Sequence, residues 1–353
     1  MRRIRVLIVE DSLTVRKYLW SVLSADPEVH VVAEAGDGKE AIELCAEHKP
    51  DVITMDMMLP VMSGFSATEY IMAYCPTPIL VVSSSVNRGE LFRTYDALAA
   101  GAVDVLEKPT GAIPEEAWER RFLATVKLVS RISVITHPRA RLLTLQQARL
   151  VREQGALASA LPPRRRIVAI GASTGGPAAI VEVLRTLPAS FELPILLVLH
   201  INELFGTAFA DWLDAQLALG VVYARGGESL AGMRGKVIMA PAGRHLTVRN
   251  GRLALTMDAE RHFCRPSVDV LFESVATGYG PSAIACLLTG MGRDGASGLL
   301  KIRQAGGLTI AQDEATSIVY GMPREAALLG AATQVLPLHE IGAAVVAAAG
   351  ERA

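Results

Sequence analysis

Carboxylates, a serine and a lysine follow short apolar runs in the first third of the chain. Glu10 and Asp11 come directly after RVLIV, Asp56 follows DVITM, Ser83 closes PILVVS, and Lys108 follows VDVLE. If these runs are parallel strands, their carboxyl ends line one crevice and the polar side chains meet there. Such a carboxylate cluster suits a hard divalent cation such as Mg²⁺. Asp56 could then attack a phosphoryl donor, with Lys108 and the cation neutralising charge and Ser83 hydrogen-bonding the phosphate.

The competing interpretation is that acids at strand ends are ordinary loop residues or helix N-caps. For Glu10 taken alone, that interpretation is the better one. The complete set, in this order along the chain, is much harder to explain as capping. The sequence therefore predicts a metal-dependent phosphorylation site.

A serine lies in a glycine-rich turn in the second half of the chain. The segment GASTGGP, residues 171–177, follows the apolar run IVAI and opens a helical pattern with Pro177 near its first turn. The hydroxyl of Ser173 would stand at a helix N-terminus, where free N–H groups could stabilise an oxyanion. The same pattern also looks like an altered dinucleotide-binding loop. That alternative requires an acidic residue after the next strand, but PILLVL ends in His200, which favours catalysis.

A histidine and an aspartate are expected at the same edge of this second sheet. His200 ends the strand expected beside the one that carries Ser173, and Asp294 lies in the loop TGMGRDG after the apolar run AIACLL. Together the three fit a nucleophile, its general base and the carboxylate that orients the base. A lone histidine is more often structural, and Asp294 could cap a helix, instead of or besides this role. A nucleotide-binding regulatory module remains the alternative if the three side chains do not meet.

Other candidate residues are weaker. Cys286 lies inside an expected buried strand and Cys264 has no place at a strand end, so we interpret both as structural or incidental. His245 and Arg265 are possible substrate contacts only.

The elements that would position these residues alternate between strands and helices along the whole chain. Apolar runs of four to eight residues alternate with segments of helical period, which predicts an α/β protein made of two doubly wound parallel sheets. We expect one domain over residues 1–135, a linker over 136–165, and a larger domain over 166–353 with a helix over 203–219. In the larger domain, Asn250-Gly251 between alternating segments predicts a small antiparallel hairpin.

Composition bounds the class of protein. The chain has 353 residues, of which 51% are hydrophobic and 20% charged, so it can bury a substantial core. A net charge of −1 gives no overall electrostatic reason to bind nucleic acid or an anionic membrane. No apolar run approaches the roughly 18 residues of a membrane span. The four cysteines are scattered without a C-x-x-C pair, which is typical of a reducing compartment, so we expect a cytoplasmic protein.

The expected linker is strongly basic. Residues 136–166 hold seven arginines and one acid, Glu153, and the segment is rich in proline near its ends. Such a run could contact nucleic acid. A solvated, partly helical tether is the more ordinary interpretation, and we prefer it.

The first block resembles the receiver domain of bacterial response regulators. The resemblance rests on Glu10-Asp11, Asp56, Ser83 and Lys108-Pro109 and covers roughly the first 125 residues. It implies a flavodoxin-like fold in which Asp56 is the phospho-acceptor and Glu10, Asp11 and Asp56 hold Mg²⁺. The family usually has two aspartates where this chain has Glu10-Asp11.

The second block resembles the catalytic domain of the CheB family of chemotaxis methylesterases. The resemblance rests on GASTGG, the strand-end His200, CRPSVDVLF, LLTGMGRDG, TIAQDEAT and VYGMPREA. It implies a catalytic triad of Ser173, His200 and Asp294, with the backbone N–H of Met291 and Thr174 as oxyanion contributors. Cys264 stands where a basic residue often precedes Arg-Pro-Ser.

Together the two resemblances imply a regulated hydrolase. The expected reaction is demethylation of glutamate methyl esters on methyl-accepting chemotaxis receptors, with deamidation of glutamine as a related activity and no cofactor for hydrolysis. A CheA-type histidine kinase would phosphorylate Asp56 and so relieve blockage of the catalytic crevice by the receiver. No nucleic-acid partner and no direct membrane insertion are expected.

Overall fold

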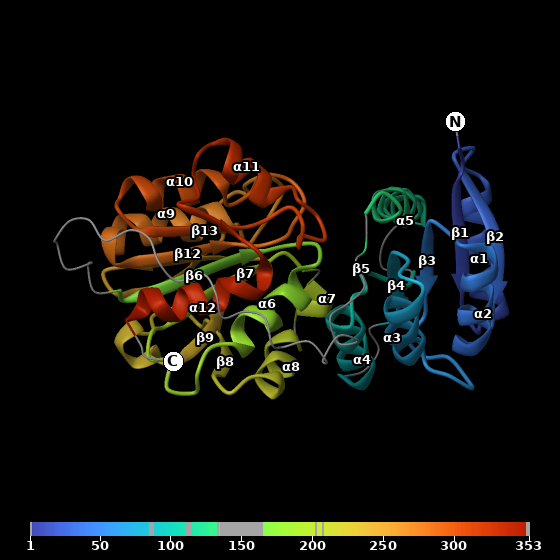
Figure 1. Ribbon diagram of the computed structural model, residues 1–353, viewed down its shortest axis with the longest axis horizontal. Helices are drawn as coiled ribbons and strands as arrows, with labels where there is room; N and C mark the ends of the chain where they lie inside the picture. Colours follow the sequence, from blue (N-terminus) through green and yellow to red (C-terminus); the bar gives the residue numbers. More distant parts are fainter. Residues whose placement is uncertain are drawn as a thin grey trace, which may run out of the picture.

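The computed structural model describes residues 2–84, 88–109, 115–132, 134, 165–201, 203–206 and 208–350. Most of the expected linker, residues 136–164, lies outside the described residues. In the described part, two parallel sheets are built from the two ends of the sequence and lie side by side (Figure 1). No described helix is long and apolar enough to cross a membrane.

The N-terminal sheet has five parallel strands in the order β2-β1-β3-β4-β5. Its strands are β1 (Ile4–Val9), β2 (Val29–Ala35), β3 (Val52–Met55), β4 (Ile79–Ser83) and β5 (Asp104–Glu107). The helices that follow them are α1 (Leu13–Ser24), α2 (Gly38–His48), α3 (Gly64–Tyr74), α4 (Arg88–Ala99) and α5 (Glu115–Val129). Strands β1, β3 and β4 are almost wholly buried because helices cover the sheet, and α5 buries the apolar stripe of Trp118, Phe122, Val126 and Val129.

The C-terminal sheet has seven parallel strands in the order β14-β13-β12-β6-β7-β9-β8. Its strands are β6 (Ile167–Ala172), β7 (Ile195–Leu199), β8 (Gly220–Tyr223), β9 (Lys236–Met239), β12 (Ala283–Leu287), β13 (Leu308–Gln312) and β14 (Gln334–Leu336). The helices are α6 (Gly176–Arg185), α7 (Glu203–Gly206), α8 (Phe209–Gln216), α9 (Val268–Tyr279), α10 (Ala296–Gln304), α11 (Met322–Leu328) and α12 (Leu338–Ala349). The chain runs outward from β6 through β7 and later returns to place β12 on the other side of β6. The order of strands therefore reverses at β6, the place where α/β proteins form their binding crevices.

The predicted fold class is confirmed, with two local differences. The expected helix over 203–219 is divided into α7, which ends at Gly206, and α8, which begins after the N-cap Ala208. Helix α8 itself ends at Gln216 because Leu217 is extended. Strand β8 was not predicted, and it pairs with β9 at the edge of the sheet. The hairpin at Asn250-Gly251 is confirmed as β10 (His245–Arg249) and β11 (Arg252–Thr256), with positive φ at both turn residues.

Helix α4 of the first sheet packs against α6 and α8 of the second. Tyr95 is fully buried at this contact, with its ring centroid 5.3 Å from that of Phe209 and 5.4 Å from that of Trp212. Its hydroxyl donates to the carbonyl of Phe205, and the Trp212 indole donates to Asp96 at 2.8 Å. Aromatic pairs of this kind add about 0.5–1.5 kcal/mol each beyond their buried area. The two sheets are therefore joined by a specific apolar contact.

Candidate active site and phosphorylation site

The predicted phosphorylation residues meet at the carboxyl ends of β1, β3, β4 and β5. Lys108 Nζ lies 2.8 Å from a Glu10 carboxylate oxygen and 2.9 Å from Asp56 Oδ2. Glu10, Asp56 and Ser83 are buried, whereas Asp11 is exposed at the mouth of the crevice. Burial raises the pKa of Glu10 against the opposing effect of Lys108. The ammonium of Lys108 thus holds two buried carboxylates together.

The same carboxylates can accommodate a cation. One oxygen from each of Glu10, Asp11 and Asp56 lies within 4.8 Å of the other two. A set of three carboxylates open to solvent on the Asp11 side matches the oxygen ligands and retained waters that Mg²⁺ prefers. The longer Glu10 side chain therefore still places its carboxylate within this set.

Ser173 follows β6 and is positioned by close backbone contacts. Its N–H donates to Thr289 O at 3.0 Å, and its carbonyl accepts from Gly176 N at 2.7 Å. A Cβ on Gly290 would lie 2.7 Å from the Ser173 Cβ, so only glycine allows the loop after β12 to approach this closely. The side chain is partly exposed and lines the same cavity as His200.

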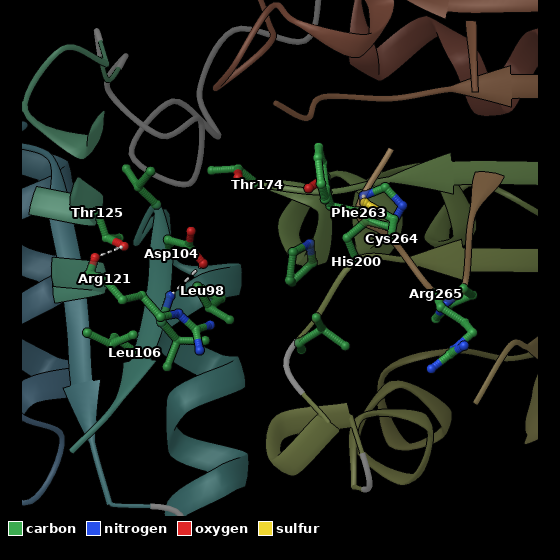
Figure 2. Close-up of a pocket in the computed structure, with 17 residues that line it drawn as sticks. Leu98, Asp104, Leu106, Arg121, Thr125, Thr174, His200, Phe263, Cys264 and Arg265 are labelled. Atoms are coloured by element: carbon green, nitrogen blue, oxygen red, sulfur yellow. Dashed lines mark hydrogen bonds between the residues drawn. The ribbon is translucent and has the colours of Figure 1, made fainter. Parts of the chain in front are cut away.

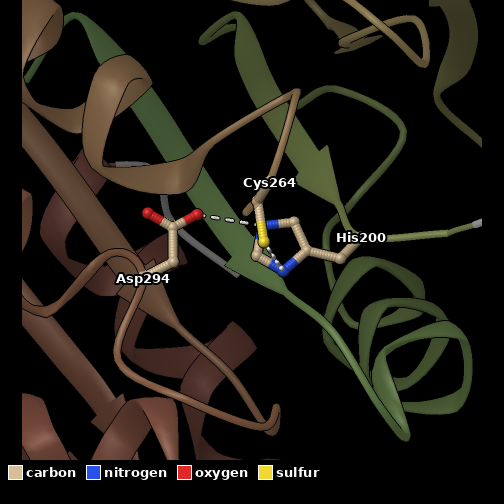
Figure 3. A group of neighbouring side chains, drawn as sticks. All are labelled: His200, Cys264 and Asp294. Carbon is tan, nitrogen blue, oxygen red and sulfur yellow. Dashed lines mark hydrogen bonds and ion pairs between the residues drawn. The ribbon is translucent and has the colours of Figure 1, made fainter. Parts of the chain in front are cut away.

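His200 and Asp294 form a hydrogen-bonded pair. Nε2 of His200, which follows β7, lies 2.9 Å from Oδ2 of Asp294, which is 2% exposed in the loop after β12 (Figure 3). Nδ1 is therefore the ring nitrogen that does not face Asp294. No hydrogen bond joins the Ser173 and His200 side chains among the described residues, and catalytic contacts commonly tighten only when substrate binds.

Asp294 also lies at the N-terminus of a helix, but this helix is α9 and not α10, which directly follows Asp294 in the sequence. The N-cap of α10 is Gly295, without a side-chain capping bond. The carboxylate of Asp294 instead accepts from the hydroxyl of Ser267 at 2.8 Å and from the N–H groups of Val268 at 2.7 Å and Asp269 at 3.1 Å, at the start of α9. Burial works against ionisation, but these donors and His200 hold the pKa of Asp294 below its ordinary value. Asp294 is thus an anion fixed in place before any substrate arrives.

Cys264 lies beside the pair, although its position in the sequence led us to interpret it as structural or incidental. Its Sγ is 3.7 Å from His200 Nδ1 (Figure 3). Burial opposes protonation of the imidazole, yet Asp294 and Cys264 together raise the pKa of His200 to about 9. Cys264 comes from an irregular segment before α9 rather than from a strand end, so its place in the CRPSVDVLF motif was the only sequence signal near it. The other three weak candidates behave differently: Cys286 and His245 are fully buried, and Arg265 lines the cavity.

The two predicted oxyanion contributors lie on loops that flank Ser173. The carbonyl of Thr174 accepts from Thr289 Oγ1 at 3.0 Å, which fixes the turn after the serine. The N–H of Met291 has no hydrogen-bond acceptor among the residues that the structure describes. The role of this N–H as an oxyanion donor stays a prediction.

A cavity of about 340 Å³ separates these residues from the receiver. Figure 2 shows its two walls, with Thr174, His200 and Cys264 on one side and side chains of the first sheet on the other. The opposing wall is formed by β5 and α5 and includes Asp104 and Arg121. Burial raises the pKa of Asp104 to about 6. The receiver therefore stands directly over the crevice that Ser173 and His200 line.

Two family models match the chain, one to each sheet. A response regulator receiver domain matches residues 6–114, and the CheB methylesterase matches residues 168–345, half of the chain. This chain belongs to the CheB methylesterase family. A protein-glutamate methylesterase/protein-glutamine glutaminase of Nitrosospira multiformis is 44% identical over 352 residues, covering 99% of this chain and 98% of the relative. A relative of the same name in Cupriavidus pinatubonensis is 42% identical and covers 98% and 97% of the two chains.

A solved structure agrees with the CheB assignment. The CheB methylesterase catalytic domain of Thermotoga maritima is 36% identical and superposes with a TM-score of 0.50 over 52% of this chain and 98% of its own. The resemblances to the receiver and CheB families are thereby confirmed. The roles of individual site residues stay predictions.

Proposed function

We propose that this CheB-family protein hydrolyses glutamate methyl esters, and also deamidates glutamine side chains, on methyl-accepting chemotaxis receptors. The observation that carries the proposal is the His200–Asp294 pair facing the cavity that Ser173 also lines. The names of the relatives support the same activity. The proposal places the protein in the cytoplasm, where receptor signalling domains are accessible, and divides the chain at residues 1–135, 136–165 and 166–353.

The proposed mechanism proceeds through an acyl-enzyme. Ser173 Oγ attacks the ester carbonyl while His200 Nδ1 takes the hydroxyl proton, and Asp294 stabilises the imidazolium from the other side of the ring. The Met291 N–H and the turn at Thr174 stabilise the oxyanion of the tetrahedral intermediate. The intermediate expels methanol, which takes its proton from His200. Water then attacks the acyl-enzyme by the same route and releases the glutamate, whereas a glutamine substrate would release ammonia.

The receiver would regulate access to this crevice. A histidine kinase of the CheA type donates a phosphoryl group to Asp56, next to Lys108 and Ser83, and Mg²⁺ held by Glu10, Asp11 and Asp56 supplies positive charge there when it is bound. In the unphosphorylated state, β5 and α5 cover the catalytic wall, and α4 is anchored on α8 through Tyr95 and Trp212. Phosphorylation would weaken this contact and open the crevice.

Methanol release from methylated receptor fragments tests both parts of the proposal. We expect Ser173→Ala to abolish release with or without a small phosphodonor such as acetyl phosphate. Asp56→Asn should retain the basal rate but lose stimulation by the phosphodonor. Release unaffected by Ser173→Ala would exclude the serine mechanism, and stimulation that survives Asp56→Asn would exclude Asp56 as the phospho-acceptor.

A further inference from the structure

A tight turn of four residues, Arg261–Cys264, ends at the catalytic crevice. Its ends are joined by two backbone hydrogen bonds, from Arg261 N to Cys264 O at 3.2 Å and from Cys264 N to Arg261 O at 2.9 Å. The two central residues, His262 and Phe263, have φ values of 52° and 61°. Turns with positive φ at both central positions strongly favour asparagine and glycine. A phenylalanine there is a locally unfavourable choice.

The turn is nevertheless held firmly in place. His262 Nε2 lies 3.1 Å from Oδ2 of the buried Asp269, and Arg293 Nε donates to His262 Nδ1 at 3.3 Å. These contacts fix the first central residue, so the second projects in a defined direction. The turn thus holds the Phe263 side chain in a fixed position.

The Phe263 ring makes few contacts with the rest of the fold. It is 97% exposed, the highest exposure among the large hydrophobic side chains of the described residues. Its position next to Cys264 places it on the rim of the cavity that Ser173 and His200 line (Figure 2). Backbone conformations that are unfavourable for the residue and yet rigidly supported are characteristic of binding sites.

We infer that Phe263 is a specificity-determining residue, whose ring contacts an apolar side chain of the protein substrate beside the glutamate that enters the crevice. The inference rests on the proposed function. A protein segment with its ester at Ser173 extends beyond the cavity and passes the rim, whereas a small ester is contained within it. Phe263 therefore contributes to the binding of protein substrates and not to the chemical step.

The test compares a protein substrate with a small ester in the full chain, with acetyl phosphate present. Phe263→Asn removes the ring and introduces a residue that tolerates positive φ. Phe263→Tyr keeps an aromatic ring. Tyr74→Asn is the control, at another exposed aromatic residue, on α3. Substrates are a methylated receptor fragment and p-nitrophenyl acetate. For Phe263→Asn we expect the receptor KM to rise about five- to thirtyfold, as for loss of an aromatic contact of about 1–2 kcal/mol at about 1.4 kcal/mol per factor of ten.

The accompanying measurements separate a binding role from a structural one. Hydrolysis of p-nitrophenyl acetate and the kcat on receptor should stay within about twofold of the unsubstituted protein. Phe263→Tyr and Tyr74→Asn should keep the receptor KM, and the melting temperature of Phe263→Asn should be unchanged or higher. A receptor KM unchanged by Phe263→Asn, an equal loss on both substrates, or a lower melting temperature would each overturn the inference. If the unsubstituted protein cleaves p-nitrophenyl acetate but releases no methanol from receptor, the proposed function itself fails, and the inference with it.

Discussion

Replacing Cys264 by alanine should change the pH dependence of hydrolysis. The general base must be neutral to accept the Ser173 proton, and the pKa of His200 is raised to about 9 by Asp294 and by the thiol 3.7 Å from Nδ1. With that value, about 1% of the imidazole is neutral at pH 7. The protein should therefore be much more active at alkaline pH than at neutral pH.

The expected change in kcat/KM follows from removing one of the two groups that raise the pKa of His200. Cys264→Ala removes one of these groups, so the pKa of His200 should fall below about 9 and more than about 1% of the imidazole should be neutral at pH 7. We expect kcat/KM at pH 7 to rise severalfold, while the plateau above pH 10 stays unchanged.

The pH dependence of the stability of the fold is a second measure of the His200 pKa. Because the folded-state pKa lies above the ordinary value of 6.5, the contacts of His200 stabilise the fold fully below pH 6.5 and lose this effect as the pH rises through about 9.

The assay is hydrolysis of p-nitrophenyl acetate between pH 6.5 and 10.5, with the rate of the Ser173→Ala variant subtracted at each pH. Cys75→Ala is the matched control, because Cys75 is a partly exposed thiol at the C-terminal end of α3 in the receiver. The pH profile of the Cys75→Ala variant should coincide with that of the unsubstituted protein. An apparent pKa near 6.5 in the unsubstituted protein, or an identical profile after Cys264→Ala, would refute the assigned influence of the thiol on His200.

Three further predictions concern groups around the crevice. Asp294→Asn keeps the shape of the side chain but removes the charge that orients the imidazole, so kcat on ester should fall about 10³- to 10⁴-fold. Gly290→Ala would place a Cβ 2.7 Å from that of Ser173, and we expect loss of ester hydrolysis together with a lower melting temperature in a thermal scan. Asp96→Ala removes the acceptor of the Trp212 indole at the receiver contact, so methanol release without phosphodonor should increase while the rate with phosphodonor changes little.

Local sequence patterns were sufficient to predict most of the fold. Apolar periodicity is set by whether one face or both faces of an element are buried, so it marked both parallel sheets before any contact was known. It did not predict strand β8, which is short and has exposed positions at an edge of the sheet. It also joined α7 and α8 into one helix, because the pattern of apolar residues continues across the break near Gly206.

The sequence by itself also determined which residues reach the two crevices. A polar residue directly after a buried parallel strand must lie at the carboxyl edge of the sheet, which placed Asp56, Ser173 and His200 without knowledge of their neighbours. What lies opposite them depends on contacts between distant segments, and these leave no local pattern. Only the tertiary structure brought Cys264 to His200 and set Asp294 at the start of α9, because each of these contacts joins segments that are far apart in the sequence and meet only when the second sheet is folded. The resemblance led us to expect the receiver at the crevice, but only the tertiary structure showed that β5 and α5 line the opposing wall of the cavity.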